Sequence, residues 1–171
     1  MICAMWGCEH MYEETGGMNL PEWSALPDIG LYMDQVVTLM DRTFAAGEIT
    51  KSMVNNYVKS GLLKRPVGKK YEREQLAQLI MIGVLKQALS MDDIASLLVL
   101  LCAEGTQAGY AGFCSMVAAV DGAHEQDGSA AQRFADPDTP QERAVLYGVA
   151  ASVCAMRARG MLAQLDQVKE C

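Results

Sequence analysis

The sequence predicts a mainly helical protein with one small β-hairpin, and three observations support this fold class. Apolar residues recur at helical spacing in several segments, beginning with residues 32–44. Residues that favour helix starts, such as Thr50 and Thr139, stand just before two of the later segments. Between the helical segments, residues 62–71 contain a proline and a glycine that interrupt helices and suit a short hairpin.

Two amphipathic helices are expected first, over residues 32–44 and 51–60. The first has apolar residues three and four positions apart, and Ala46-Gly47 is expected to end it. Thr50 is a good N-cap for the second helix, and Gly61 follows where a C-terminal glycine belongs. Residues 20–28 precede both helices and predict turns or one short helical turn.

The second helix has two chemically distinct faces. Its apolar face carries Met53, Val54, Tyr57 and Val58, and we expect Tyr57 to lie in the core. Its polar face has no acid and carries Lys51, Ser52, Asn55, Asn56 and Lys59. Lysine, serine and asparagine suit phosphate and base-edge contacts in a major groove, so this face is a candidate recognition surface for DNA.

The predicted hairpin carries four cations at its tip and flanks, namely Lys64, Arg65, Lys69 and Lys70. The formal net charge of the chain is −7, which taken whole argues against a nucleic-acid binder. However, residues 49–73 hold seven of the 14 Lys and Arg residues and one of the 21 acids, a net +6, which leaves −13 elsewhere. Such asymmetry suggests a local anionic partner, although a solvated basic surface is the commoner explanation on charge alone.

A third helix is expected from Glu72 or Arg73 to about Ala88, apolar nearly all round and therefore buried. A fourth begins after Ser90, in a capping box whose other member is an aspartate, and runs through residues 94–101.

The rest of the chain predicts two further helices. Residues 105–112 are small and predict a flexible connection, followed by a helix over 113–120 and a polar loop over 121–138. Thr139, with proline and glutamate behind it, starts a helix that runs to about Val168. Its small and apolar inner residues allow close helix approach, either to its own domain or to a second copy.

The cysteines and the motif content exclude several classes. The six cysteines form no CxxC pair, and Cys102, Cys114 and Cys154 lie in apolar stretches where cysteine is usually buried, so we expect a reduced, cytoplasmic protein. Cys3, Cys8 and His10 lack a fourth ligand, so no metal site is expected. No uncharged run reaches membrane-spanning length, and no catalytic or cofactor motif occurs. We therefore expect no enzyme, no cofactor and no membrane contact.

Several elements together resemble the MerR type of winged helix-turn-helix regulator. In order they are Tyr57, Gly61-Leu62-Leu63, Lys64-Arg65-Pro66, Tyr71-Glu72-Arg73-Glu74 and Ser90-Met91-Asp92-Asp93-Ile94. From Leu20 to about Leu101 the chain is more closely similar to the bacterial family called domain of unknown function 1836. The chain departs from the MerR pattern in Asn55-Asn56-Tyr57, where an arginine before an aromatic pair is common, and in Ala88, where glycine is usual. The last 70 residues match no effector domain. The cysteines do not lie where metal-sensing members of the MerR type hold theirs, so the resemblance does not imply metal sensing for this chain.

The resemblance implies a sequence-specific, DNA-binding transcriptional regulator of bacterial type. The expected organisation is a lead-in over 1–19, a MerR-like winged-helix domain over 20–104 and a helical C-terminal region over 105–171 that packs or dimerises. The expected contacts with double-stranded DNA come from Lys51, Ser52, Asn55, Asn56, Lys59, Lys64, Arg65, Lys69, Lys70 and Arg73. A homodimer through the C-terminal helices is expected. No sequence motif supports a pocket for a small-molecule effector among these helices. The alternative is a protein-interaction module that keeps this fold without binding DNA.

Overall fold

The computed structural model describes residues 18–44, 48–122 and 139–169, with the side chains of α7 described as far as Leu162. In chain order the elements are η1 (Trp23–Ala25), β1 (Leu31–Tyr32), α1 (Met33–Thr43), α2 (Lys51–Lys59), β2 (Lys70–Tyr71), α3 (Arg73–Leu85), α4 (Met91–Leu101), α5 (Thr106–Gly122) and α7 (Pro140–Lys169). The prediction of a mainly helical protein with a small antiparallel sheet is confirmed.

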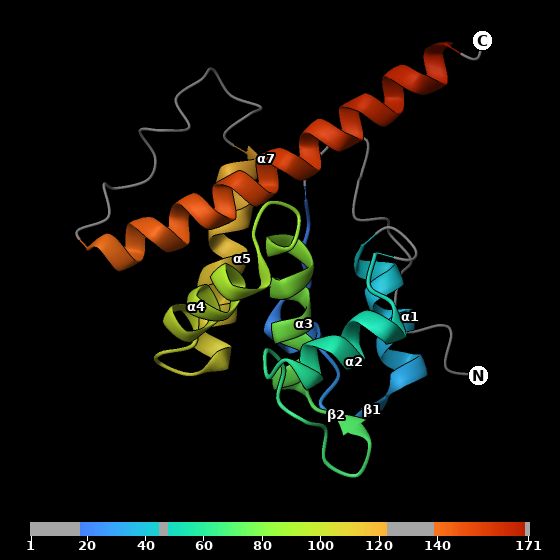
Figure 1. Ribbon diagram of the computed structural model, residues 1–171, viewed down its shortest axis with the longest axis vertical. Helices are drawn as coiled ribbons and strands as arrows, with labels where there is room; N and C mark the ends of the chain where they lie inside the picture. Colours follow the sequence, from blue (N-terminus) through green and yellow to red (C-terminus); the bar gives the residue numbers. More distant parts are fainter. Residues whose placement is uncertain (1–17, 45–47, 123–138, 170–171) are drawn as a thin grey trace.

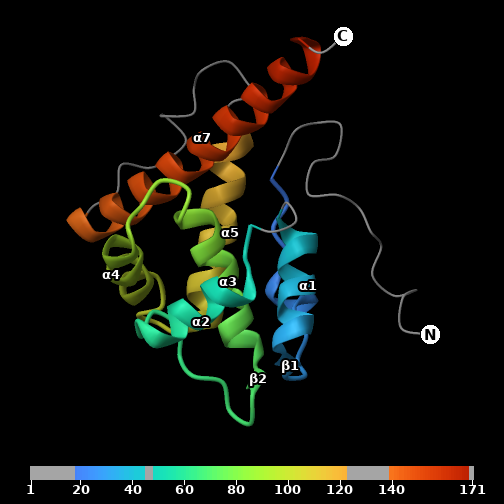
Figure 2. The ribbon, with the colours of Figure 1, turned by 45° about the vertical axis from the view of Figure 1, so that its right-hand side comes forward.

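Helix α3 is the centre of the molecule. It contacts α1, α4, α5 and α7, and Figures 1 and 2 show α7 lying across the end of the bundle formed by α3 and α5. Residues Leu76–Ala77 and Leu79–Leu85 of α3 are all buried, as its apolar sequence predicts. One hydrophobic cluster runs from Met18 to Val153, so residues on both sides of position 104 share a core.

The first two helices are confirmed close to their expected bounds. Helix α1 ends at Thr43 with Phe44 as its C-cap, and Ala46-Gly47 lies outside the described residues. The segment before them contains η1, the single helical turn that was one of the two expectations for residues 20–28.

The hairpin prediction for residues 62–71 is only partly correct. The turn exists, because the Lys70 amide donates to the Val67 carbonyl at 3.0 Å, and these two residues form an isolated antiparallel bridge. The strand that pairs with β2 is β1, from before the first helix. The register pairs Leu31 with Tyr71 and Tyr32 with Lys70. The basic turn is therefore joined to a strand that precedes α1 and does not form a self-contained hairpin.

Two helix boundaries were wrong. Helix α3 ends at Leu85 rather than near Ala88, and α5 begins at Thr106 rather than near Phe113. The predicted flexible connection therefore forms the first turns of α5. Gly109 makes this possible, because a Cβ there would stand 2.0 Å from the Leu101 carbonyl oxygen. The glycine permits close approach of two helices instead of breaking one.

Two other predictions fail. Asp121 was expected in a polar loop but lies near the end of α5, buried, where its carboxylate pairs with Arg157 of α7 and accepts from the Met18 amide. Cys154 was expected to be buried and is exposed on α7, whereas Cys102 and Cys114 are half-buried. Burial raises the pKa of the thiols of Cys102 and Cys114. Residues 123–138, the remainder of the predicted loop, and Cys3, Cys8 and His10 lie outside the described residues.

The start of α7 is confirmed as a capping box. The Thr139 amide donates to Glu142 Oε2 at 3.0 Å, and the Glu142 amide donates to Thr139 Oγ1 at 3.2 Å. The inner face of the helix packs on the domain through Val145, Val149 and Val153. Among the described residues, the stretch Pro140–Leu162 is long and apolar enough to cross a membrane by length and composition, with 28% of the window buried inside the protein.

Candidate nucleic-acid interface

Helix α2 separates its two faces as its sequence predicts. Thr50 caps the helix, accepting a hydrogen bond on Oγ1 from the Met53 amide at 3.3 Å. Val54 and Tyr57 are buried, which confirms Tyr57 as a core residue, and desolvation raises the pKa of its phenol. The opposite face is exposed at every predicted position, namely Lys51, Ser52, Asn55, Asn56 and Lys59. The core anchors one side of the helix and leaves the acid-free side open to solvent.

The C-terminus of α2 directs the chain into the basic segment. Gly61 adopts a φ of +80°, and the Leu63 amide donates to the Tyr57 carbonyl at 3.0 Å, closing the last turn. Leu63 is 1% exposed and fixes the exit of the helix in the core. Lys64 and Arg65 follow immediately, both exposed.

The basic segment turns at Gly68-Lys69, where both residues have positive φ, 57° and 63°. Two successive residues in this conformation form the tight turn that suits the twist of an antiparallel pair. Lys69 is the non-glycine member, so the turn presents a lysine at its tip. Lys70 continues into β2, and its Nζ lies 5.3 Å from the centre of the Tyr32 ring, within cation–π range.

Two residues that support this surface were missed from the sequence. Tyr32 holds the Lys70 ammonium from β1, and Gln75 of α3 donates from Nε2 to the Lys64 carbonyl at 2.8 Å, tying the basic segment to the core helix. No local pattern in the sequence indicates either contact, because each joins segments that are separated along the chain.

Not all the candidate cations are equally available. The guanidinium of Arg73 turns toward η1, where Nε donates to the Pro27 carbonyl at 3.4 Å and Cζ lies 5.8 Å from the centre of the Trp23 ring. A terminal nitrogen is also 3.9 Å from Asp28. Lys51 forms an exposed ion pair with Asp34. The other five cations, Lys59, Lys64, Arg65, Lys69 and Lys70, are exposed.

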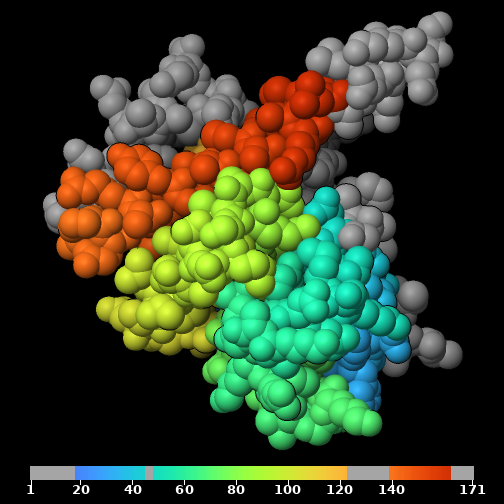
Figure 3. Space-filling view, in the orientation of Figure 1, coloured from blue at the N-terminus to red at the C-terminus, as the bar shows by residue number. Residues whose placement is uncertain are grey.

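The structure brings α2 and the basic segment together on one side of the molecule. Figure 3 shows them adjacent, with α2 in teal above the segment in green, on the face toward the viewer. Between Ile49 and Tyr71 there is no Asp or Glu. Nine of the ten predicted DNA contacts are exposed in this region, and Arg73 is the half-buried exception.

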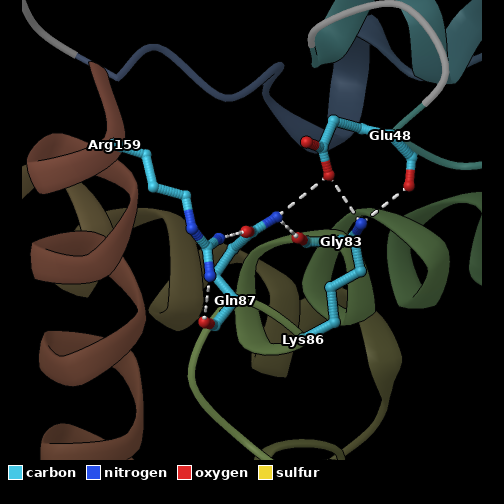
Figure 4. A network of polar contacts seen from close by, with 5 residues as sticks. All are labelled: Glu48, Gly83, Lys86, Gln87 and Arg159. Atoms are coloured by element: carbon cyan, nitrogen blue, oxygen red, sulfur yellow. Dashed lines mark hydrogen bonds and ion pairs between the residues drawn. The ribbon is translucent and has the colours of Figure 1, made fainter. Parts of the chain in front are cut away.

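A polar network fixes the approach to α2 (Figure 4). The Lys86 ammonium donates to both the carbonyl and the carboxylate of Glu48, at 2.7 and 2.6 Å. Gln87 donates to the same carboxylate at 3.2 Å, and it accepts on its own backbone carbonyl from Arg159 of α7 at 3.1 Å. The hydrogen bond from Lys86 is the main reason why the pKa of the Glu48 carboxyl is lowered. Since Glu48 lies two residues before the Thr50 cap, the network ties the start of α2 to α3 and α7.

The described residues contain no group of three or more His, Cys, Asp and Glu residues that could hold a metal ion. The groups that the basic surface exposes are cations, amides and a hydroxyl, carried on a helix and a turn that the core anchors. Such groups bind anions and hydrogen-bonding partners.

Taken together, the elements define a mainly helical protein with a two-stranded sheet and an exposed basic surface. A family model described as Domain of unknown function (DUF1836) matches residues 21–111, and the chain belongs to that family. The match covers η1 to the first turns of α5 and so includes the whole basic surface. Comparisons with curated proteins and with solved structures found no match.

Proposed function

We propose that this protein is a DNA-binding transcriptional regulator whose N-terminal part is a MerR-like winged helix-turn-helix. The observation that carries the proposal is the acid-free exposed face of α2 beside a tight turn that presents Lys69 and Lys70. Helix α2 enters the major groove in this proposal, with Ser52, Asn55 and Asn56 near base edges.

The basic segment neutralises phosphates in this arrangement. Six exposed cations lie on α2 and on the basic segment beside it: Lys51, Lys59, Lys64, Arg65, Lys69 and Lys70. Each phosphate contact releases counterions, so the logarithm of the binding constant falls with the logarithm of salt at about −0.9 per contact, or about −5 for six cations. Arg73 is expected to brace η1 and contribute less, because its guanidinium already contacts Pro27 and Trp23.

The test is fluorescence anisotropy of a labelled random duplex at several salt concentrations, with the full chain. We expect binding that weakens steeply with salt. Lys69→Glu weakens binding to every sequence, whereas Arg42→Glu, which reverses an exposed charge in the last turn of α1, leaves it nearly unchanged.

Absent or salt-independent binding contradicts the proposal and favours the protein-interaction alternative. Equal losses of duplex affinity in Lys69→Glu and Arg42→Glu also contradict the proposal, since they indicate that binding responds to the net charge of the protein and not to this surface.

A further inference from the structure

A hollow in the surface lies between three helices, on the side of the molecule away from α1. The C-terminal end of α4, the first half of α5 and the first turns of α7 line it, and Figures 1 and 2 show α4 and the start of α7 together on this side. The hollow, which we call the α5 groove, has a volume of about 500 Å³ and is open to solvent. A volume of this size is typical of binding sites in proteins.

The α5 groove exists because α5 presents small side chains between two helices that carry larger ones. Ala108, Gly109 and Gly112 line the groove from α5, Leu100 lines it from α4 and Val145 from α7. A Cβ added at Gly112 would meet nothing within 4 Å, so the groove is empty at that point. The groove therefore offers apolar walls and space for apolar side chains of another molecule.

The apolar surface continues from the groove along the exposed face of α4. Val99 and Leu100 are 73% and 38% exposed, and Ala95, about one turn before Val99, is also exposed. Residues three and four positions apart share one face of a helix, so these side chains lie together. An exposed apolar surface that adjoins a groove is typical of a site that another molecule covers.

Acidic side chains stand at both ends of this apolar surface. Asp92 and Asp93 begin α4, Glu104 follows its C-terminus, and all three are exposed. Glu142 lines the groove from α7, where its carboxylate also accepts a hydrogen bond from a backbone amide. Residues 87–122 contain no Lys, Arg or His, and none of the described residues that line the groove is basic. The surface is therefore apolar in the middle and negative at its ends.

We propose that the α5 groove and the exposed face of α4 bind an amphipathic helix of another protein, whose apolar stripe is flanked by lysine or arginine. A helix of this kind inserts apolar side chains at three- and four-residue spacing into a groove. Asp93 and Glu104 are 11 positions apart, which is roughly 16 Å at 1.5 Å per residue, or about three helical turns. A partner stripe of three turns with basic residues at each end therefore matches both the apolar and the acidic parts of the surface.

The same features disfavour other occupants. Nucleic acids and anionic lipid headgroups are negatively charged, and a face with acids and without cations repels them. A small hydrophobic cation fits the groove but leaves the exposed Val99 and the acids at the start of α4 without a role. A partner helix covers the groove and the face of α4 together.

This binding goes beyond the proposed DNA recognition and does not depend on it. The basic surface on α2 and the α4 face have opposite charge, so a cationic helix and a DNA duplex do not compete for one site. The partner helix is measured without DNA. A chain that binds the helix and no duplex leaves this proposal standing, and the reverse result overturns this proposal alone.

The first experiment uses a fluorescent synthetic peptide of about 18 residues, or about five helical turns. Leucines stand at three- and four-residue spacing in its middle, and lysines stand at both ends. We expect the full chain to bind this peptide in an anisotropy titration. We expect weak binding of a peptide with the same residues in scrambled order and no binding of a peptide with glutamates in place of the lysines.

A leucine placed in the groove locates the binding. Gly112→Leu should raise the dissociation constant of the peptide at least about tenfold, because the new side chain occupies the space of an anchor. Gly122→Leu, at another exposed position of α5 where an added Cβ meets nothing, is the matched control and should change it less than about twofold. Circular dichroism establishes that both variants stay folded.

A charge reversal tests the acidic ends. Glu104→Lys should raise the dissociation constant of the peptide about fivefold or more, and Asp28→Lys, the same reversal before β1, should change it less than about twofold. Equal effects of these two changes indicate attraction by net charge and overturn the proposal.

Three further results overturn it. The lysine-flanked peptide does not bind, binds no better than its scrambled form, or binds equally to Gly112→Leu and Gly122→Leu. Benzyltributylammonium, a small hydrophobic cation, binds more tightly than the peptide and is excluded by Gly112→Leu, which assigns the groove to a small molecule. Sedimentation shows self-association of the full chain that Gly112→Leu abolishes, which assigns the groove to a second copy.

Discussion

The ring of Phe44 lies against Gly83 so closely that a Cβ on residue 83 would stand 2.6 Å from two ring atoms. Phe44 is the C-cap of α1, and Gly83 lies in the central helix, so this contact sets how closely the segment before α2 approaches α3. Gly83→Ala should lower the free energy of unfolding by about 1–3 kcal/mol, because the new methyl group forces the Phe44 ring to move within a packed core.

The control for that change is Gly112→Ala in α5, where a new Cβ meets nothing within 4 Å. It should raise stability by about 0.5–1 kcal/mol, since alanine is the better helix former. Urea unfolding of both variants measures the difference. Similar effects of the two substitutions contradict the close contact with Phe44.

Removing the buried ion pair between Asp121 and Arg157 should lower the free energy of unfolding far more than removing an exposed ion pair. The two side chains are 4% and 17% exposed, and Arg157 also donates to the Asp121 carbonyl at 3.0 Å. Asp121→Ala leaves a mostly buried guanidinium without its carboxylate. It should therefore lower the free energy of unfolding by about 3 kcal/mol or more. Asp34→Ala, which removes the exposed partner of Lys51, should cost less than about 1 kcal/mol. Comparable losses in thermal or urea unfolding argue against this ranking.

Acid should destabilise the protein partly through Glu48. Its pKa in the folded protein is lowered from 4.5, chiefly by the hydrogen bond from Lys86. The stabilisation is therefore present above pH 4.5 and is lost as the pH falls through the lower folded-state value. The melting temperature of the wild type should fall more steeply between pH 5 and about pH 3 than that of Glu48→Gln, in which no charge is lost. Parallel curves for the two proteins contradict this role of the Lys86 contact.

The two parts of the proposed interface should respond differently to substitution. Asn55→Ala, on the exposed face of α2, should change which duplexes are preferred, because an asparagine amide reads base edges. Lys69→Glu with Lys70→Glu should weaken binding to all duplexes and reduce the salt slope by about 2. Selection of binding sites from a random library, followed by anisotropy on the selected and scrambled duplexes, measures both. An unchanged preference in Asn55→Ala removes that residue from the proposed recognition set.

The helix starts and the two faces of α2 depend on residues close together in the chain, so they could be predicted from the sequence. Thr50, Ser90 and Thr139 cap the helices that they were expected to start, because a side-chain oxygen and an amide three residues later need no distant partner. The division of α2 into a buried and an exposed face was also predictable, since helical spacing alone decides which residues share a side.

The contacts that complete the surface depend on segments far apart in the chain. Strand β2 pairs with β1, about 40 residues earlier, so the partner of the basic turn was not visible in the turn itself. The hydrogen bond from Gln75 to Lys64 and the ring of Tyr32 beside Lys70 have the same origin. Gly109 was expected to interrupt a helix, but it lies inside α5 where the helix approaches the Leu101 carbonyl closely. Helix packing overrides the low helix propensity of glycine at this position.

By itself the sequence determined where most helices begin, which face of α2 is polar and where the positive charge is concentrated, because these depend on neighbouring residues. Only the tertiary structure decided that Arg73 turns inward to η1, that Asp121 is a buried partner of Arg157 and that α7 covers the domain with one apolar face and exposes the other. The physical reason is that the apolar pattern of α7 is compatible with burial on either side. Which side is buried depends on the shape of the core that α3 and α5 present to it.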